Sequence, residues 1–145
     1  MDKPFGEQTY HDDSVFTFAK GPAADAAEYW TLFPANGTVL DVGCGERRNA
    51  IFLAEKGLII DAFDISEAGI EKAKRIVATR QLDINSMCKD LVQFVSEKVY
   101  GIIFFHGVLH LASLPIGCQP QPTMSLLQNR FLTWANCHPV ILTGK

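Results

Sequence analysis

A short apolar run that ends in a pair of glycines constrains the fold of this chain more than any other feature. Thr38–Val42 is β-branched and apolar, as buried parallel strands are, and it leads directly into Gly43-Cys44-Gly45. Residues 47–56 then carry apolar side chains at helical spacing, and Gly57 is well placed to end a helix. A strand, a tight glycine turn and a helix in this order predict an α/β fold.

The alternation of strand and helix patterns continues along the chain. Further strands are expected at 58–64, 83–88, 99–105 and 140–143, and helices at 22–33, after the capping residue Ser66, and at 123–136. Residues 1–21 are typical of an irregular arm, and 91–95 of a short helix or loop. Because strands that alternate with helices are joined by right-handed crossovers, we expect a doubly wound, mostly parallel sheet of about five strands.

Composition excludes several classes of function. The chain has 145 residues and a formal net charge of −3, so it has the size of one domain and offers no basic field to a nucleic-acid backbone. No apolar stretch is long enough to span a bilayer, and the N-terminus lacks the pattern of a secretory signal. The four cysteines form no C-x-x-C pair, which favours free thiols. We therefore expect a cytoplasmic protein with neither nucleic acid nor a membrane as partner.

Acidic residues are absent from the last third of the chain. All 16 Asp and Glu lie within residues 1–97 with ten Lys and Arg, a net charge of −6, whereas residues 98–145 carry three basic residues and no acid. Two interpretations stay open: the later strands are buried, or the chain beyond Ala112 is not what this fold normally carries, through truncation or a changed reading frame. We expect one domain over 1–145, with an arm and helix at 1–35, a core at 36–112 and an atypical tail at 113–145.

Polar residues follow the predicted strands at the edge where open parallel sheets bind ligands. Gly43 and Gly45 permit a sharp turn that a ligand can approach closely. Asp64 ends the second strand 19 residues after Gly45, an offset at which an acid can accept hydrogen bonds from ribose hydroxyls. Asp90 and Leu91 follow the third strand and suit an adenine ring, although Asp90 is also a common kind of helix cap. The series predicts a site for an adenosine-containing cofactor.

Several motifs occur in one order: Asp41-Val-Gly-Cys-Gly45, then 48–54, 62–66, 88–91 and 100–105. Together they resemble the S-adenosylmethionine-dependent methyltransferases with a Rossmann-like fold, and among these the tellurite-resistance type and its small-molecule methyltransferase relatives. The resemblance covers residues 36–112 and implies S-adenosylmethionine as the cofactor. It also implies a sheet of seven strands, of which this chain has residues for about five and lacks the usual last two.

The resemblance assigns roles to the residues at the strand ends. Asp41 and the glycine loop would hold the methionine end of the cofactor, the acid after the second strand its ribose, and the pair after the third strand its adenine. His106, just past the fourth strand, would border the transferred methyl group and is the candidate catalytic residue. The implied cofactor-binding positions are Asp41, Gly43, Cys44, Gly45, Asp64, Ile65, Asp90, Leu91 and His106.

The chain departs from the family pattern at two places. Arg47 stands where a third glycine is expected, and Tyr100-Gly101 replaces an aromatic residue followed by Asp at the start of the fourth strand. A side chain at position 47 must swing outward or take up ligand space, so we expect weaker cofactor binding than in a glycine-bearing variant. A cationic Arg47 can instead pair with the carboxylate of the methionine moiety.

Other candidate residues have simpler explanations. His106 and His110 lie four residues apart, but no third ligand accompanies them at useful spacing, so we expect no metal site. Cys44 and Cys88 are typical of small packing residues. The arm residues Tyr10, His11 and Phe16 either fold over the site or lie elsewhere, and the sequence favours neither.

The sequence thus predicts methyl transfer from S-adenosylmethionine to a small-molecule acceptor, with His106 taking a proton where the acceptor must lose one. One alternative is a non-catalytic or truncated remnant that binds the cofactor and pairs as a homodimer through an open sheet edge at 140–143. The other is an NAD-dependent oxidoreductase, whose fingerprint requires a glycine at the position of Arg48.

Overall fold

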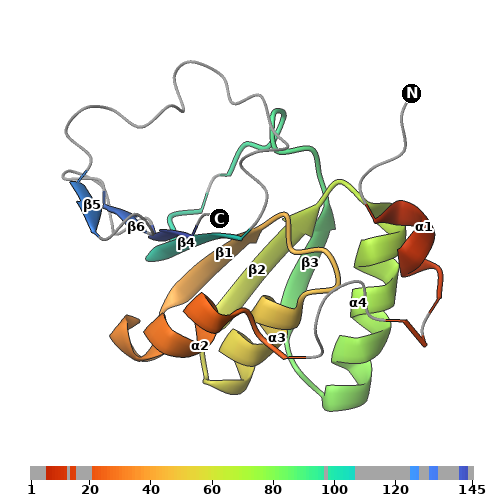
Figure 1. The fold of residues 1–145 in the computed structure, drawn as a ribbon, viewed down its shortest axis with the longest axis horizontal. Coiled ribbons are helices and arrows are strands. Elements are labelled where there is room, and N and C mark those ends of the chain that lie inside the picture. Colours follow the sequence, from red (N-terminus) through yellow and green to blue (C-terminus); the bar gives the residue numbers. More distant parts are fainter. Residues whose placement is uncertain are drawn as a thin grey trace.

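A parallel sheet of five strands forms the centre of the structure (Figure 1). The computed structural model describes residues 6–12, 14–15, 21–96 and 98–106, and the backbone of three strands at 125–127, 131–133 and 141–143. The sheet has the order β3-β2-β1-β4-β7, and each neighbouring pair is parallel. Its strands are β1 (Thr38–Val42), β2 (Ile59–Asp64), β3 (Ile84–Cys88), β4 (Ile102–His106) and β7 (Ile141–Thr143).

Strand β1 lies in the middle of this sheet, so the turn that follows it is flanked on both sides. Val39 pairs in register with Ile60 of β2 and with Ile102 of β4, and all three side chains are buried. On its other side, strand β2 pairs with β3. Because all the strands run the same way, their carboxyl ends lie along one edge, as expected from the sequence.

The three longer helical segments cover one face of the sheet (Figure 1). They are α2 (Ala24–Tyr29), continued by the 3-10 turn Trp30–Leu32, α3 (Arg48–Glu55) and α4 (Glu67–Arg80). The Ser66 hydroxyl caps α4 as expected, because it accepts a hydrogen bond of 3.0 Å from the backbone N–H of Gly69. A further short helix, α1 (Glu7–Tyr10), packs beside α4 in the part of the chain expected to be irregular.

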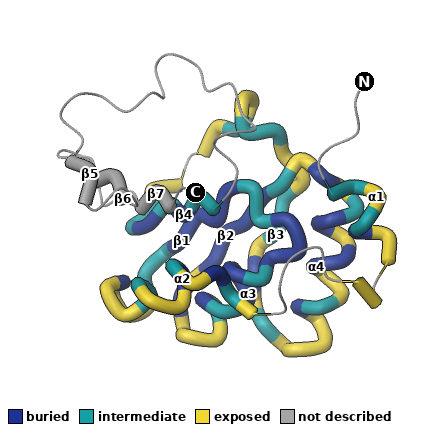
Figure 2. Tube along the Cα trace, in the orientation of Figure 1, coloured by how far each residue is buried: buried dark blue, intermediate teal, exposed yellow. Residues whose placement is uncertain are grey.

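Strands β1 and β2 are mostly buried (Figure 2), and the alternation of side chains along the strands separates the core into two layers. Toward the helices, Val39 and Phe104 pack with residues such as Ala50 and Leu53 of α3. On the opposite face, Leu40, Val42 and Phe63 are covered by the segment between β3 and β4. There the ring of Phe94 stacks on Phe63 with 4.2 Å between centroids. In the described part of the chain, a loop rather than a helix covers this second face.

The tail differs from the prediction. Residues 123–136 were expected to form a helix, but the structure has two strands there, β5 (Ser125–Leu127) and β6 (Phe131–Thr133), which pair antiparallel. The periodicity of short apolar runs does not distinguish a helix from a strand. Pairing between the two segments, with Leu126 opposite Leu132, supplies the backbone hydrogen bonds that neither strand has alone. Strand β6 lies beside β7, which ends the parallel sheet. Dimerisation through this edge stays a prediction.

The remaining boundaries agree with the sequence to within a few residues. β4 begins at Ile102 rather than at residue 99, and 91–95 forms a turn and loop, one of the two forms expected there. Predictions for Phe16 and His110, and for most of the tail, lie outside the described residues. None of the described helices combines the length and the apolar character that crossing a bilayer requires.

A buried ion pair holds the N-terminal arm against the body of the fold. Lys72 of α4 is 1% exposed and lies 2.6 Å from the Glu46 carboxylate, which is 5% exposed. The ammonium of Lys72 also donates hydrogen bonds to the backbone oxygens of Asp12, at 2.8 Å, and of Val15. This buried cation therefore joins α4 to the arm and to the loop after β1.

We predict that Lys72→Met destabilises the protein by about 3–5 kcal/mol, because it breaks a buried ion pair by removing one of its two charges. Urea unfolding followed by circular dichroism measures the difference in free energy. Lys74→Met is the matched control: the same helix carries an exposed ion pair of Lys74 with Glu71, whose partners are 51% and 54% exposed, and its loss should change little. Equal effects of the two substitutions would contradict the prediction.

Candidate functional site

The loop after β1 is fastened to the end of β2 by backbone hydrogen bonds. The N–H groups of Gly43 and Cys44 donate to the carbonyl oxygen of Phe63, at 2.9 and 3.0 Å. The N–H of Gly45 donates to Oδ2 of Asp64 at 2.8 Å. Gly43 and Gly45 have φ values of 67° and 49°, a left-handed conformation that glycine adopts without steric cost. The sequence expectation of a tight turn at these glycines is thus met.

Asp64 joins the loop after β1 to the start of α4. Its Oδ2 accepts from Gly45, and its Oδ1 accepts from the backbone N–H of Ser66 at 2.8 Å. A carboxylate has about four lone-pair sites, so both oxygens keep capacity for a further donor. The side chain is partly exposed, and the adjacent Ile65 is 54% exposed. An acid able to accept further donors and an uncovered apolar side chain therefore stand together at the end of β2.

Asp41 is a buried acid directly below the loop. It is 2% exposed, and its Oδ2 finds no hydrogen-bond partner among the described residues. Burial, and secondarily the negative charge of Asp64, raise the pKa of Asp41 to about 7, against opposing effects of Arg47 and of the Ala50 N–H. Burial likewise raises the pKa of the Cys44 thiol. Near neutral pH a large fraction of the Asp41 side chains is therefore uncharged.

The Arg47 side chain points inward. It is 0% exposed, and Nε, Nη1 and Nη2 have no hydrogen-bond partner among the residues that the structure describes. The residue has φ 61° and precedes the first turn of α3. Of the two steric outcomes that the sequence left open, an outward swing is excluded. A buried guanidinium without a partner is costly, which makes this residue the least satisfied group of the site.

Tyr10 covers the glycine loop from the arm. It is 3% exposed, and a Cβ added to Gly45 would lie 2.8 Å from its hydroxyl oxygen. A Cβ added to Gly69 would lie 3.1 Å from its ring. Burial, with a smaller contribution from the charge of Asp64, raises the pKa of the Tyr10 hydroxyl. Nearby, the Ser66 hydroxyl donates to the Glu7 carboxylate, which holds α1 in place.

Asp90 and Leu91 follow β3, and their described contacts are with their own segment and the core rather than with the glycine loop after β1. Oδ1 of Asp90 accepts a hydrogen bond of 2.9 Å from the backbone N–H of Val92 and so closes a local turn. Leu91 packs beside the layer formed by Leu40, Val42 and Phe63. The backbone N–H of Lys89 donates to the carbonyl of Asp64 at 2.9 Å, which keeps the end of β3 close to that of β2.

His106 ends β4 and lies between an acid and an arginine. Its Nδ1 is 3.3 Å from Oδ2 of Asp25 in α2, and its Nε2 is 3.3 Å from Nη2 of Arg48. Because a guanidinium can only donate, Nε2 is the acceptor, and Nδ1 carries the proton that it donates to Asp25. Asp25 was not singled out from the sequence: it lies 81 residues from His106, and nothing in its surroundings marks it.

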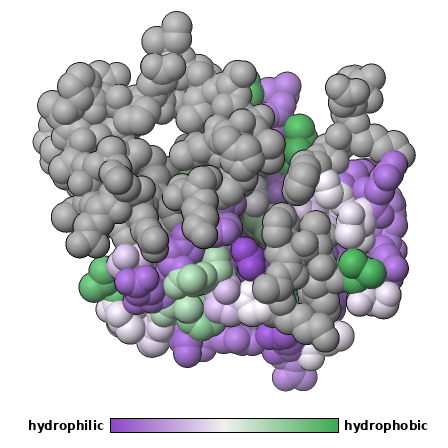
Figure 3. Space-filling model, in the orientation of Figure 1, coloured by the Kyte–Doolittle hydropathy of each residue, from purple (hydrophilic) through white to green (hydrophobic). Residues whose placement is uncertain are grey.

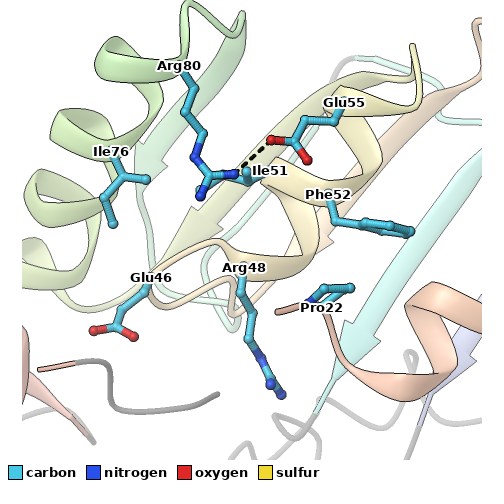
Figure 4. Close-up of a pocket in the computed structure, with 8 residues that line it drawn as sticks. All are labelled: Pro22, Glu46, Arg48, Ile51, Phe52, Glu55, Ile76 and Arg80. Carbon is cyan, nitrogen blue, oxygen red and sulfur yellow. Dashed lines mark hydrogen bonds and ion pairs between the residues drawn. The ribbon is translucent and has the colours of Figure 1, made fainter. Parts of the chain in front are cut away.

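A small cavity lies between α3 and α4 (Figure 4). Its volume is about 70 Å³, and the ion pair of Arg80 with Glu55, at 2.7 Å, stands at its wall. Pockets for drug-sized ligands measure about 300–1,000 Å³, so this cavity does not admit a nucleoside. On the side of the molecule where α4 lies, the residues that Figure 3 colours are mostly hydrophilic. The cavity is lined by Pro22, Glu46, Arg48, Ile51, Phe52, Glu55, Ile76 and Arg80.

A comparison with protein-family models identifies the family. Residues 6–118 match the model described as tellurite resistance protein TehB. The chain belongs to the TehB family. The match includes α1 and Tyr10 as well as the strand ends described above, and it extends beyond β4. The resemblance drawn from the motifs is thereby confirmed.

Curated relatives of this TehB-family chain are methyltransferases. A ubiquinone biosynthesis O-methyltransferase of Coxiella burnetii is 43% identical over 53 residues, which are 37% of this chain and 23% of that enzyme. An uncharacterised methyltransferase of Schizosaccharomyces pombe is 32% identical over 99 residues, 61% of this chain and 68% of that protein. The chain thus spans less than a quarter of the Coxiella enzyme.

Solved structures share the fold of this TehB-family chain. TehB from Haemophilus influenzae superposes with a TM-score of 0.57 at 20% identity, over 72% of this chain and 34% of that one. An S-adenosylmethionine-dependent methyltransferase from Thiobacillus denitrificans, solved with S-adenosylhomocysteine, gives 0.59 at 20% identity, over 74% and 45%. At these identities the likeness establishes the α/β fold, which the sequence predicted.

We predict that Asp41 makes the stability of the protein fall as pH rises. Its pKa is raised from 3.8 to about 7 in the folded state, so the fold binds this proton more tightly than the unfolded chain does. Stability from this group is full below about pH 4 and is lost as pH rises toward 7, by roughly 4 kcal/mol in total. Urea unfolding of the protein and of Asp41→Asn across this range measures the difference. Parallel pH profiles would refute the assignment.

Proposed function

We propose that this chain transfers a methyl group from S-adenosylmethionine to a small-molecule acceptor in the cytoplasm. The observation that carries the proposal is the glycine loop after β1, fastened to Asp64 at the end of β2 with the buried Asp41 beneath it, in a chain of the TehB family. In open parallel sheets ligands bind at this edge, where the carboxyl ends of the strands meet. The names of the curated relatives support methyl transfer.

The residues at this edge fit the parts of the cofactor. Asp64 retains acceptor sites for the ribose hydroxyls, and the free Oδ2 of Asp41 suits the ammonium group at the methionine end. The exposed Ile65 and the partly buried Leu91 offer apolar surface that would suit an adenine, and Asp90 would accept from its amino group. Gly43, Cys44 and Gly45 would face the methionine end of the cofactor, and Tyr10, whose hydroxyl lies against Gly45, would be the wall of the site there.

The sulfonium of S-adenosylmethionine supplies a methyl group that is already activated, so the protein mainly aligns the reactants and excludes water. Tyr10 serves exclusion, because it is buried against the loop and is held there by the arm. His106 serves proton removal, because Asp25 fixes its tautomer and leaves Nε2 as the acceptor. Arg48 would have to release Nε2 when an acceptor binds.

We expect S-adenosylmethionine and S-adenosylhomocysteine, but not NAD, to raise the melting temperature of the protein. Asp64→Ala should weaken binding of both by at least about tenfold, since it removes charge-assisted hydrogen bonds to the ribose. A thermal-shift titration measures this, and circular dichroism confirms that the variant is folded. Asp83→Ala removes an exposed acid before β3 and is the control that should bind normally. Stabilisation by NAD alone, or by none of the three, would refute the proposal.

We also expect His106 to be the Nδ1–H tautomer at mildly alkaline pH, because Asp25 accepts from Nδ1 and Arg48 donates to Nε2. The nitrogen chemical shifts of the imidazole, measured by NMR, distinguish the two tautomers. Asp25→Asn should shift the population toward the other tautomer while cofactor affinity stays within about twofold, since Asp25 contacts no proposed cofactor residue except His106. An Nε2–H tautomer in the unmodified protein would rule out this role for His106.

A further inference from the structure

We infer that Arg47 makes the proposed cofactor site selective for a nucleoside that carries a carboxylate, by pairing its buried guanidinium with that group. The inference rests on the proposed function. It concerns a residue in which this chain departs from the glycine pattern of the methyltransferases it resembles. The inference is that the site binds a nucleoside with a carboxylate more tightly than an otherwise identical nucleoside without one.

The first support is the unsatisfied state of the guanidinium. Arg47 is fully buried, and Nε, Nη1 and Nη2 have no well-formed hydrogen bond among the described residues, although the guanidinium lies close enough to Cys44 and Asp41 to lower their pKa values. Taking a charged group out of water without a partner is expensive, and arginine cannot avoid the cost by losing its proton. A ligand anion placed against it would recover that cost. The planar guanidinium also matches a carboxylate, which can accept two of its N–H groups at once.

The second support is that the acids around the loop interact with groups other than Arg47. Glu46 pairs with Lys72 at 2.6 Å, and Asp64 accepts from the N–H groups of Gly45 and Ser66. Asp41 is the remaining buried acid, and burial raises its pKa to about 7, so it supplies at most part of a counter-charge at neutral pH. No ion pair joins Asp41 to Arg47 within the described residues. In the described part of the chain, none of these three carboxylates is hydrogen-bonded to the Arg47 guanidinium.

The third support is the position of Arg47 in the chain. It is the N-cap of α3, two residues after Gly45, and so lies at the positive end of the helix dipole. A helix N-terminus favours anions, and it adds to the attraction of the guanidinium. Arg48 does not replace Arg47 in this role, because its guanidinium is engaged with His106.

The test compares S-adenosylmethionine with decarboxylated S-adenosylmethionine, which lacks only the carboxylate, by isothermal titration at neutral pH. We expect the unmodified protein to bind S-adenosylmethionine at least about tenfold more tightly than the decarboxylated form, as charge-assisted hydrogen bonds to a buried group require. Arg47→Met retains the length and bulk of the side chain and removes the charge. It should bring the affinity ratio to about one.

Two further variants separate the effect of the charge of Arg47 from the effect of its bulk. Arg80→Met removes an exposed arginine of α4 and should leave the ratio unchanged. Arg47→Gly should lower the ratio as Arg47→Met does, while relief of bulk raises the affinity for the decarboxylated form, consistent with the expectation that Arg47 takes up ligand space. Steric effects act on both ligands and leave their ratio unaltered.

The outcomes distinguish this inference from the proposed function. If the unmodified protein binds both nucleosides equally well, the cofactor assignment stands and the role of Arg47 is overturned. The same holds if Arg47→Met, shown by circular dichroism to be folded, keeps the full ratio. If the unmodified protein binds neither nucleoside, the proposed function itself fails. Should Arg47→Met not fold, the ratio in the unmodified protein still decides whether the site recognises the carboxylate.

Discussion

The bond between the glycine loop and the end of β2 is the constraint on which the rest of this site depends. Three consecutive backbone N–H groups, of Gly43, Cys44 and Gly45, are directed to acceptors of Phe63 and Asp64. These bonds hold the loop against the end of β2, and α3 begins at Arg48, three residues after Gly45. The same carboxylate fixes the start of α4 through Ser66. One acid thus sets the relative positions of two helices and two strands, and any ligand must fit that arrangement.

Buried charge is distributed unevenly around this loop. The Lys72–Glu46 pair is satisfied on both sides and holds the arm, so Tyr10 stays over Gly45. Asp41 and Arg47, by contrast, keep polar atoms that find no hydrogen-bond partner in the described part of the chain. Breaking a buried ion pair destabilises a fold, and buried charges that lack a partner cost stability and are found where a ligand completes them. The satisfied pair therefore belongs to the structure of the site and the unsatisfied groups to its proposed binding function.

Much of the fold could be predicted from local patterns. β1 was predicted at its observed bounds, and α3, β2 and β3 to within a residue, because their runs are strongly apolar or periodic and are bounded by glycines or a cap. The helix predicted at 123–136 was wrong. The apolar residues there fit a helix as well as a hairpin, and the pairing of β5 with β6 favours the hairpin. The start of β4 was less certain, since Val99 is apolar but exposed.

The sequence by itself determined the α/β fold, the glycine loop and the acids at the strand ends, and with them the family, because these follow from residue type and short spacing. Only the tertiary structure decided that Arg47 turns inward, that Tyr10 covers Gly45 and that Asp25 meets His106. These contacts join residues up to 81 positions apart, through the packing of helices on a sheet. Local pattern carries no information about such pairs, because they form only when the layers close on one another.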